Sequence, residues 1–129
     1  MGRAARVLVV DDDESIVDFV CEALVDEGYD VQTATDGGEA LALARAHRPD
    51  VILLDMRMPI MDGWEFARDY RQAPGPHGAL VVMTAARDAA RIAADIGAAG
   101  YLAKPFTLDQ LLSVVEDCRA MLASREATA

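Results

Sequence analysis

Short apolar runs alternate with longer amphipathic segments along the whole chain. Five runs have the length of β-strands, at residues 7–10, 29–34, 51–54, 80–83 and 100–103. Each is followed by a segment with helical spacing of its apolar residues, at 14–27, 36–47, 62–73, 88–96 and from 108 onward. Apolar strands joined by helices are parallel and covered on both faces. The pattern predicts an α/β fold, a three-layer doubly wound (βα)5 sandwich around a five-stranded parallel sheet.

Polar residues mark where the predicted helices begin. Asp36 and Asp62 each stand three residues before a glutamate, which is the spacing of a capping box. Thr107 has the same position before the last helix. Asp13 and Glu14 are interpreted as acids of a first helical turn, where negative charge is favourable. These residues support the helix boundaries that the apolar spacing predicts.

Length and composition predict one globular domain. The 129 residues are 53% hydrophobic, and we expect a frayed tail at residues 124–129. No apolar stretch approaches the roughly 20 residues of a membrane span, and no signal peptide precedes the first strand. A cytoplasmic location without membrane contact is therefore expected. The net charge of −10 and the absence of a helix-turn-helix pattern argue against direct nucleic-acid binding.

Polar side chains stand where four of the five predicted strands end. Asp11 and Asp12 follow the first strand, Asp55 the third, Thr84 the fourth and Lys104 the fifth. Taken alone, an Asp-Asp pair, a threonine or a Lys-Pro at such a position is more often structural than functional, and an aspartate such as Asp55 is about as often a turn residue. Because parallel strands bring their carboxyl ends to one edge, where open α/β sheets place their sites, we expect these residues to form one crevice.

The predicted crevice has the chemistry of a cation and phosphoryl site. Three neighbouring carboxylates repel one another unless a cation binds them. All-oxygen ligands favour Mg²⁺, and the absence of histidine and cysteine from the crevice argues against zinc. Lys104 can pair with a carboxylate at rest and with a phosphoryl oxygen afterwards, while Thr84 offers a hydroxyl. Together these groups supply the positioning and charge neutralisation that phosphoryl transfer needs.

These residues lie in sequence motifs that resemble a response-regulator receiver domain of two-component signalling. The matching stretches are residues 9–14, 53–63, 82–85 and 100–106. The resemblance covers about residues 5–122, which implies a single receiver domain over 1–129. It also implies the flavodoxin-like strand order 2-1-3-4-5.

The resemblance assigns a phosphoacceptor and a metal site. Asp55 would accept a phosphoryl group from a phosphohistidine and contribute to the metal site. Asp12 would bind Mg²⁺, or Mn²⁺ as an alternative, directly, and Asp11 would act mainly through water. The backbone carbonyl of Arg57 would be a further ligand. Receivers of this kind are phosphoproteins that catalyse only their own phosphorylation and slow self-dephosphorylation.

The resemblance also assigns the switch. Thr84 and Lys104 would bind phosphoryl oxygens, and Tyr101 would turn inward when Thr84 moves toward the phosphate. Ala85 and Arg57 would govern access to the phosphoryl group. The switch surface would comprise residues 88–96, residues 100–103 and the last helix.

The implied function is a stand-alone receiver controlled by a sensor histidine kinase or a phosphotransfer protein. Its output would be a downstream protein, the next carrier of a phosphorelay, or a homodimer formed through the switch surface. Two alternatives stay open at this point. The chain could be a phosphorylation-independent interaction module, or one receiver of a larger kinase or regulator.

Overall fold

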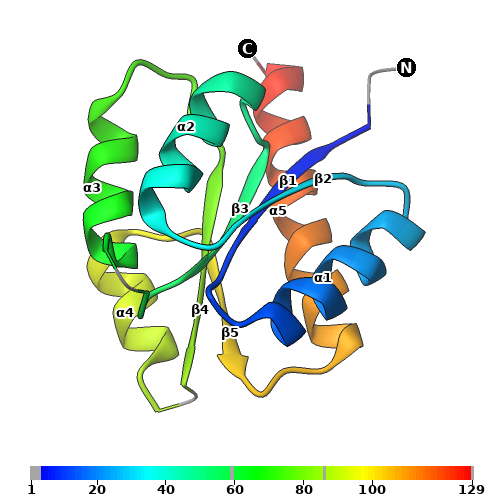
Figure 1. Cartoon of the computed structure of the whole chain (residues 1–129). Coiled ribbons are helices and arrows are strands. Elements are labelled where there is room, and N and C mark those ends of the chain that lie inside the picture. The colour runs from blue at the N-terminus through cyan, green and yellow to red at the C-terminus, as the bar shows by residue number, and fades with distance from the viewer. Residues whose placement is uncertain (1–3, 59, 86, 129) are drawn as a thin grey trace.

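A computed structural model describes residues 4–58, 60–85 and 87–128 (Figure 1). In this part of the chain, strands and helices alternate as the sequence predicts. The strands are β1 (Arg6–Val10), β2 (Asp30–Ala34), β3 (Val51–Asp55), β4 (Ala79–Ala85) and β5 (Gly100–Lys104). The helices are α1 (Glu14–Asp26), α2 (Gly37–His47), α3 (Gly63–Gln72), α4 (Ala89–Ile96) and α5 (Leu108–Thr128).

The strands form one parallel sheet in the order β2-β1-β3-β4-β5, which confirms the expected topology. Alternate residues of each strand point to opposite faces, and two apolar clusters result. One cluster joins Leu8 and Ile52 to buried residues of α2, α3 and α4. The other joins Val9 and Leu53 to buried residues of α1 and α5. The three layers are visible in Figure 1.

Side-chain caps begin α2, α3 and α5. Asp62 and Glu65 form a full capping box at α3, as the spacing predicts. Asp36 caps α2 by accepting from the backbone N–H of its third helical residue. At α5, the Thr107 hydroxyl accepts from the N–H of Gln110, whose side chain accepts from the N–H of Thr107. These caps satisfy N–H groups that lack a partner within the helix.

The structure differs from the sequence expectations at several ends of elements. Strands β3 and β5 include Asp55 and Lys104, and β4 continues past Thr84 to Ala85. Helix α5 extends to Thr128, so residues 124–128 are helical where a frayed tail is expected. Alanine, arginine and glutamate favour helix, and no glycine or proline interrupts this segment. Among the described residues, none of the helices is long and apolar enough to cross a membrane.

Candidate functional site

The carboxyl ends of the strands bring the predicted acidic residues together. Asp11 directly follows β1, and Asp55 ends the neighbouring strand β3. One carboxylate oxygen from each of Asp11, Asp12 and Asp55 lies within 4.8 Å of the other two. The sequence prediction of a shared acidic crevice is confirmed for these three residues. Asp11 is fully buried and Asp55 nearly so, whereas Asp12 is exposed.

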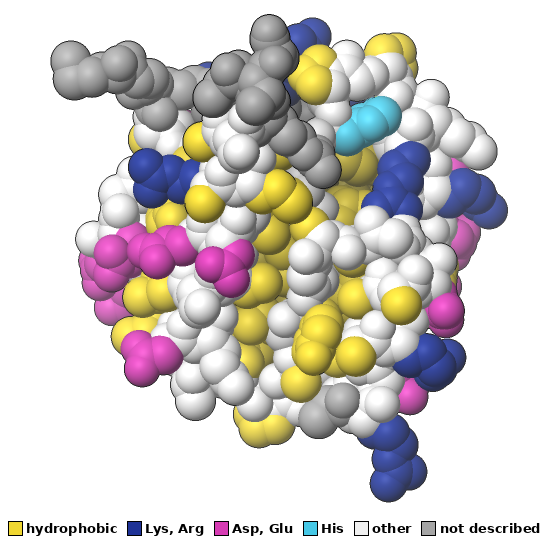
Figure 2. All heavy atoms as spheres, turned by 180° about the vertical axis from the view of Figure 1, so that it is seen from behind, with side chains coloured by type: hydrophobic (Ala, Val, Ile, Leu, Met, Phe, Trp, Pro, Cys, Tyr) yellow, Lys and Arg dark blue, Asp and Glu magenta, His cyan; other side chains and the backbone are white. Residues whose placement is uncertain are grey.

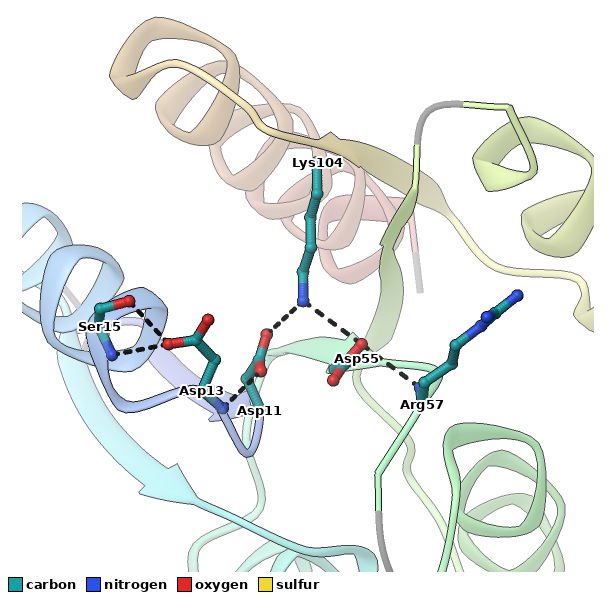
Figure 3. Close-up of polar contacts among 6 residues, drawn as sticks. All are labelled: Asp11, Asp13, Ser15, Asp55, Arg57 and Lys104. Atoms are coloured by element: carbon teal, nitrogen blue, oxygen red, sulfur yellow. Dashed lines mark hydrogen bonds and ion pairs between the residues drawn. The ribbon is translucent and has the colours of Figure 1, made fainter.

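Lys104 supplies the positive charge in the crevice. Its side chain extends from β5 between the two buried carboxylates (Figure 3). The Lys104 Nζ lies 2.8 Å from Asp11 Oδ2 and 3.4 Å from Asp55 Oδ1. Its shorter contact is therefore with Asp11, and its contact with Asp55 is the looser of the two. One ammonium offsets only part of the charge of three carboxylates.

Burial and charge change the proton affinity of this cluster. Burial, followed by the negative charge of Asp11, raises the pKa of Asp55 to about 6, and Lys104 opposes the rise only in part. Burial alone would lower the pKa of Lys104, but hydrogen bonds and charges from Asp11 and Asp55 outweigh it and raise that pKa. At neutral pH and above, Asp55 is therefore ionised and available as a nucleophile.

The turn after β1 orients the buried carboxylate. The backbone N–H of Asp13 donates to Asp11 Oδ1 at 2.9 Å. Asp13 itself caps α1, because its Oδ1 accepts from the N–H and the hydroxyl of Ser15. Hydrogen bonds from Ser15 lower the pKa of Asp13. The sequence assigns Asp13 to the first turn of the helix, but in the structure it is the N-cap, one position earlier. This turn points Asp11 inward.

Strand pairing places two further predicted residues at the same edge. Thr84 is buried near the end of β4 and pairs in register with Ala103. Ala85 is exposed and pairs with Lys104. Thr84 and Ala85 therefore lie on the strand beside Lys104, which is the placement that the motif order predicts.

Arg57 and Tyr101 point elsewhere. The backbone N–H of Arg57 donates to Asp55 Oδ1 across a long 3.4 Å, while its exposed side chain is directed away from the carboxylates (Figure 3). Tyr101 is 48% exposed and lies on β5, three residues before Lys104. Its ring is thus outside the core and outside the acidic cluster.

Tyr101 lines a groove between β5 and α5. The other residues of the groove are small or apolar with one acid, namely Ala99, Gly100, Val114, Asp117, Cys118 and Met121. Seen from behind, the molecule has hydrophobic side chains gathered along the middle of one face (Figure 2). Burial raises the pKa of the Cys118 thiol, so this cysteine is a packing residue of the groove floor.

The acidic cluster fits a hard divalent cation. Its donors are carboxylate oxygens, and two of the three carboxylates are buried. Magnesium prefers such oxygen ligands and binds few of them while keeping water molecules. The exposed position of Asp12 leaves room for that water.

Two structural features, one in the loop after Asp55 and one at the far end of α4, have no clear sequence signal. Ile60, five residues after Asp55, has a left-handed backbone (φ 72°) and is 88% exposed. A β-branched residue rarely adopts this conformation, so its sequence neighbours give no hint of it. Arg71 on α3 donates hydrogen bonds to the backbone carbonyls of Ile96 and Gly97 at the end of α4. A helical sequence pattern does not show such a contact between helices.

Comparison with known proteins agrees with this geometry. The sequence model of the family described as "Response regulator receiver domain" matches residues 7–116. Response regulator MprA of Mycolicibacterium vanbaalenii is 44% identical over 111 residues, which are 84% of this chain and 47% of that protein. The protein of the same name from Mycobacterium avium is 43% identical over 111 residues, covering 84% of this chain and 48% of its own length. The chain therefore spans about half the length of these relatives.

Solved structures show the same fold. The chemotaxis response regulator CheY4 of Vibrio cholerae superposes with a TM-score of 0.80 at 39% identity, covering 89% of this chain and 98% of that one. NtrX from Brucella abortus superposes with a TM-score of 0.85 at 31% identity. That match covers 97% of this chain but only 29% of NtrX.

Proposed function

Because the chain belongs to the response regulator receiver domain family, we propose that Asp55 accepts a phosphoryl group from a phosphohistidine donor. Members of this family are phosphoacceptor signalling modules rather than conventional enzymes, and a histidine kinase is the implied partner. The observation that carries the proposal is the position of Asp55. Its carboxylate ends β3 beside the acidic pair and within 3.4 Å of the Lys104 ammonium, with a pKa that leaves it ionised at neutral pH.

In the transfer, a new bond forms between an Asp55 oxygen and phosphorus as the P–N bond of the donor breaks. The leaving imidazole nitrogen keeps the electron pair and takes up a proton. Lys104 is already 3.4 Å from Asp55 Oδ1, so a small movement brings its ammonium onto a phosphoryl oxygen while Asp11 continues to hold it. Its contribution is neutralisation of charge on the transferring group.

Asp11, Asp12, Asp55 and the backbone carbonyl of Arg57 would hold the magnesium ion, with manganese as the alternative metal. A bound divalent cation supplies further neutralisation of the phosphoryl oxygens and aligns donor and acceptor. The protein residues contribute the oxygen donors and the ordered turn after β1 that fixes Asp11. Asp12 contributes a carboxylate that solvent and an incoming ion can reach.

The switch in this proposal starts at Thr84. Its hydroxyl bonds to the new phosphoryl group, and Tyr101 turns inward from its exposed position. Ala85 is small and Arg57 is exposed, and these two side chains govern how water reaches the phosphoryl group. Moving such a two-state equilibrium from mostly off to mostly on takes about 5.5 kcal/mol, which a few charge-assisted hydrogen bonds can supply.

The output surface is the face formed by α4, β5 and α5, with the groove beside Tyr101 at its centre. In Figure 2, acidic side chains lie mainly to the left of its hydrophobic middle and basic ones mainly to the right. A downstream protein, the next phosphorelay carrier or a second copy of the chain would bind there. The unit in this proposal is one receiver domain over residues 1–129 acting in the cytoplasm. In a stand-alone receiver this face would bind a separate protein, whereas in a larger regulator it would contact another domain of the same chain.

The test is intact-mass spectrometry after incubation with acetyl phosphate, with and without magnesium. We expect one phosphoryl adduct that requires magnesium in the wild type and is absent from Asp55→Asn. Asp109→Asn, which removes an exposed carboxylate on α5, is the matched control and should keep the adduct. An adduct of undiminished yield in Asp55→Asn would refute the assignment. No adduct in any variant, from either acetyl phosphate or a phosphohistidine donor, would favour the phosphorylation-independent module.

A further inference from the structure

The two ends of helix α4 are held very differently. At the amino end, Asp88 occupies the cap position but makes no capping hydrogen bond with its side chain. Its carboxylate instead accepts from Arg91 Nη2 at 3.0 Å, within the same helix. The amino end of α4 therefore lacks the stabilising cap that α1, α2 and α3 possess.

The carboxyl end of α4 carries several fixed contacts. Gly97 adopts a left-handed conformation (φ 67°), which ends the helix. The N–H of Gly97 donates to the Ala94 carbonyl at 3.2 Å, and the N–H of Ala98 donates to the Ala93 carbonyl at 2.8 Å. These bonds satisfy carbonyls that a helix end otherwise leaves without a partner.

Arg71 adds a contact from a different helix. It lies in the last turn of α3, and its guanidinium donates to the carbonyl of Ile96 and, at 3.0 Å, to that of Gly97. A planar guanidinium suits two adjacent carbonyls, and its charge is favourable at the negative end of a helix. Arg71 therefore attaches the carboxyl end of α4 to α3.

The loosely held end of α4 is the end nearer the candidate site. Thr84 precedes the connection into α4, and the N–H of Asp88 donates to the carbonyl of Ala85 at 3.1 Å. The buried side chains of α4 are Ala89, Ile92 and Ala93, and the partly buried Ile96 packs against the same cluster at the carboxyl end. A movement of Thr84 would reach this uncapped end of α4 first, because β4 ends one residue after Thr84 and leads into it.

We propose that Arg71 is a positioning residue that makes α4 a lever with its pivot at Gly97. The inference rests on the proposed function, since phosphorylation of Asp55 supplies the movement of Thr84. When that movement occurs, the amino end of α4 swings while the carboxyl end stays attached to α3. The swing changes the face formed by α4, β5 and α5 without displacing the helix as a whole.

The experiment is hydrogen exchange of backbone amides, read by NMR, with and without beryllium fluoride plus magnesium as a phosphoryl mimic. The variants are Arg71→Gln and the conservative Arg71→Lys. Arg68→Gln is the control, because Arg68 is an exposed arginine of the same helix that pairs only with the neighbouring Asp69 among the contacts described. Intact mass after acetyl phosphate treatment is measured first on each protein. A missing adduct on the wild type would count against the proposed function, whereas the lever is judged only on proteins that carry the adduct.

In the wild type and Arg68→Gln, we expect the mimic to change exchange at residues 88–92 by about fivefold or more, and at Gly97 and Ala98 by less than about twofold. In Arg71→Gln, we expect faster exchange at Gly97 and Ala98 without the mimic, by about threefold or more, and a mimic-induced change that spreads to these amides. Arg71→Lys should give an intermediate pattern. Equal changes at both ends of α4 in the wild type, or a wild-type pattern in Arg71→Gln, would overturn the proposal.

Discussion

At the scale of single residues, the buried negative charge of the site exceeds the positive charge that offsets it. Two buried carboxylates share one ammonium, and that ammonium lies closer to Asp11 than to Asp55. Burial of Asp55 disfavours its ionised form, which is why its pKa is raised to about 6. The carboxylate proposed to react is thus destabilised in its ionised form, and a bound cation relieves that cost.

Asp55→Asn is expected to stabilise the protein in metal-free buffer at pH 7. The folded protein binds the Asp55 proton more tightly than the unfolded chain, whose carboxyl has a pKa near 3.8. The contribution of Asp55 to wild-type stability therefore falls as the pH rises from about 4 to about 6 and stays lower above that window. Removing the charge should raise the free energy of unfolding at pH 7 by on the order of 1–3 kcal/mol, with little effect at pH 4. Urea denaturation at both pH values measures this.

Asp109→Asn serves again as the control, since its carboxylate is exposed and its removal should change stability by less than about 0.5 kcal/mol. A variant Asp55→Asn that is less stable than the wild type at pH 7 would show that the Lys104 contact outweighs burial.

Lys104→Met is expected to destabilise the metal-free protein by about 3 kcal/mol, because it leaves two buried carboxylates without their shared cation. Added magnesium should recover part of this loss, so the magnesium-induced rise in Tm should exceed that of the wild type. Thermal unfolding at fixed ionic strength, with sodium in place of magnesium as the comparison, measures both effects. Equal magnesium responses in the two proteins would argue that Lys104 and the metal neutralise different groups.

At the scale of elements, the start of α3 fits tightly against the loop that follows Asp55. A Cβ at Gly63 would lie 2.7 Å from Met56 Cα and 2.8 Å from the Asp55 carbonyl oxygen. These are backbone atoms, so they cannot move aside without moving the loop. The Gly63 N–H also donates to the Met56 carbonyl at 3.2 Å. At this helix start, Asp62 therefore caps α3, and Gly63 allows the helix to lie close to the backbone of residues 55 and 56.

Gly63→Ala is consequently expected to cost about 2–3 kcal/mol of stability and to reduce phosphoryl adduct formation at Asp55. Gly38→Ala is the matched control, because this glycine also lies in the first turn of a helix begun by an aspartate. An added Cβ there meets only one side-chain oxygen of Asp36, at 3.3 Å, and no backbone atom of another segment. Chemical denaturation and intact mass provide the two measurements, and equal losses in both variants would contradict the close-approach explanation.

Much of the fold follows from the sequence because the spacing of apolar residues and the positions of helix-capping residues predict the same element boundaries. Continuous apolar runs predict buried parallel strands, and Asp62 and Thr107 mark helix starts that the structure confirms. The meeting of Asp11, Asp12 and Asp55 also follows, since parallel strands end at one edge.

Other features depend on tertiary contacts that no local pattern encodes. The contact between Arg71 and α4 joins residues 25 and 26 positions apart, and a surface arginine has no sequence mark of such a role. The left-handed backbone of Ile60 goes against the preference of a β-branched residue, so the residue type does not predict it. The closer pairing of Lys104 with Asp11 than with Asp55 depends on ångström-scale placement of three strands.

At the scale of the whole molecule, the net charge of −10 makes divalent cations a general stabilising influence. Specific binding at the acidic cluster is distinguishable from this influence because Asp12 is exposed. Asp12→Asn should change the metal-free free energy of unfolding by less than about 0.5 kcal/mol. It should nevertheless remove most of the magnesium-induced stabilisation, which for the wild type is about 2.7 kcal/mol at a magnesium concentration of 100 Kd.

Calcium and magnesium titrations followed by thermal unfolding test this, with Asp109→Asn again as the comparison. A magnesium response in Asp12→Asn equal to that of the wild type would indicate stabilisation by bulk charge alone.

The parallel direction of the strands also determines on which side of the molecule a tether can be attached. Strand β1 begins and helix α5 ends at the same end of the molecule, at the top of Figure 1, whereas the carboxyl ends of the strands lie at the opposite end. A tether joined near either of these segment ends leaves the molecule on the side away from the carboxylates. A protein immobilised through such a tether therefore presents the edge that carries its acidic cluster to solution, so the attachment does not stand between that edge and a soluble phosphodonor.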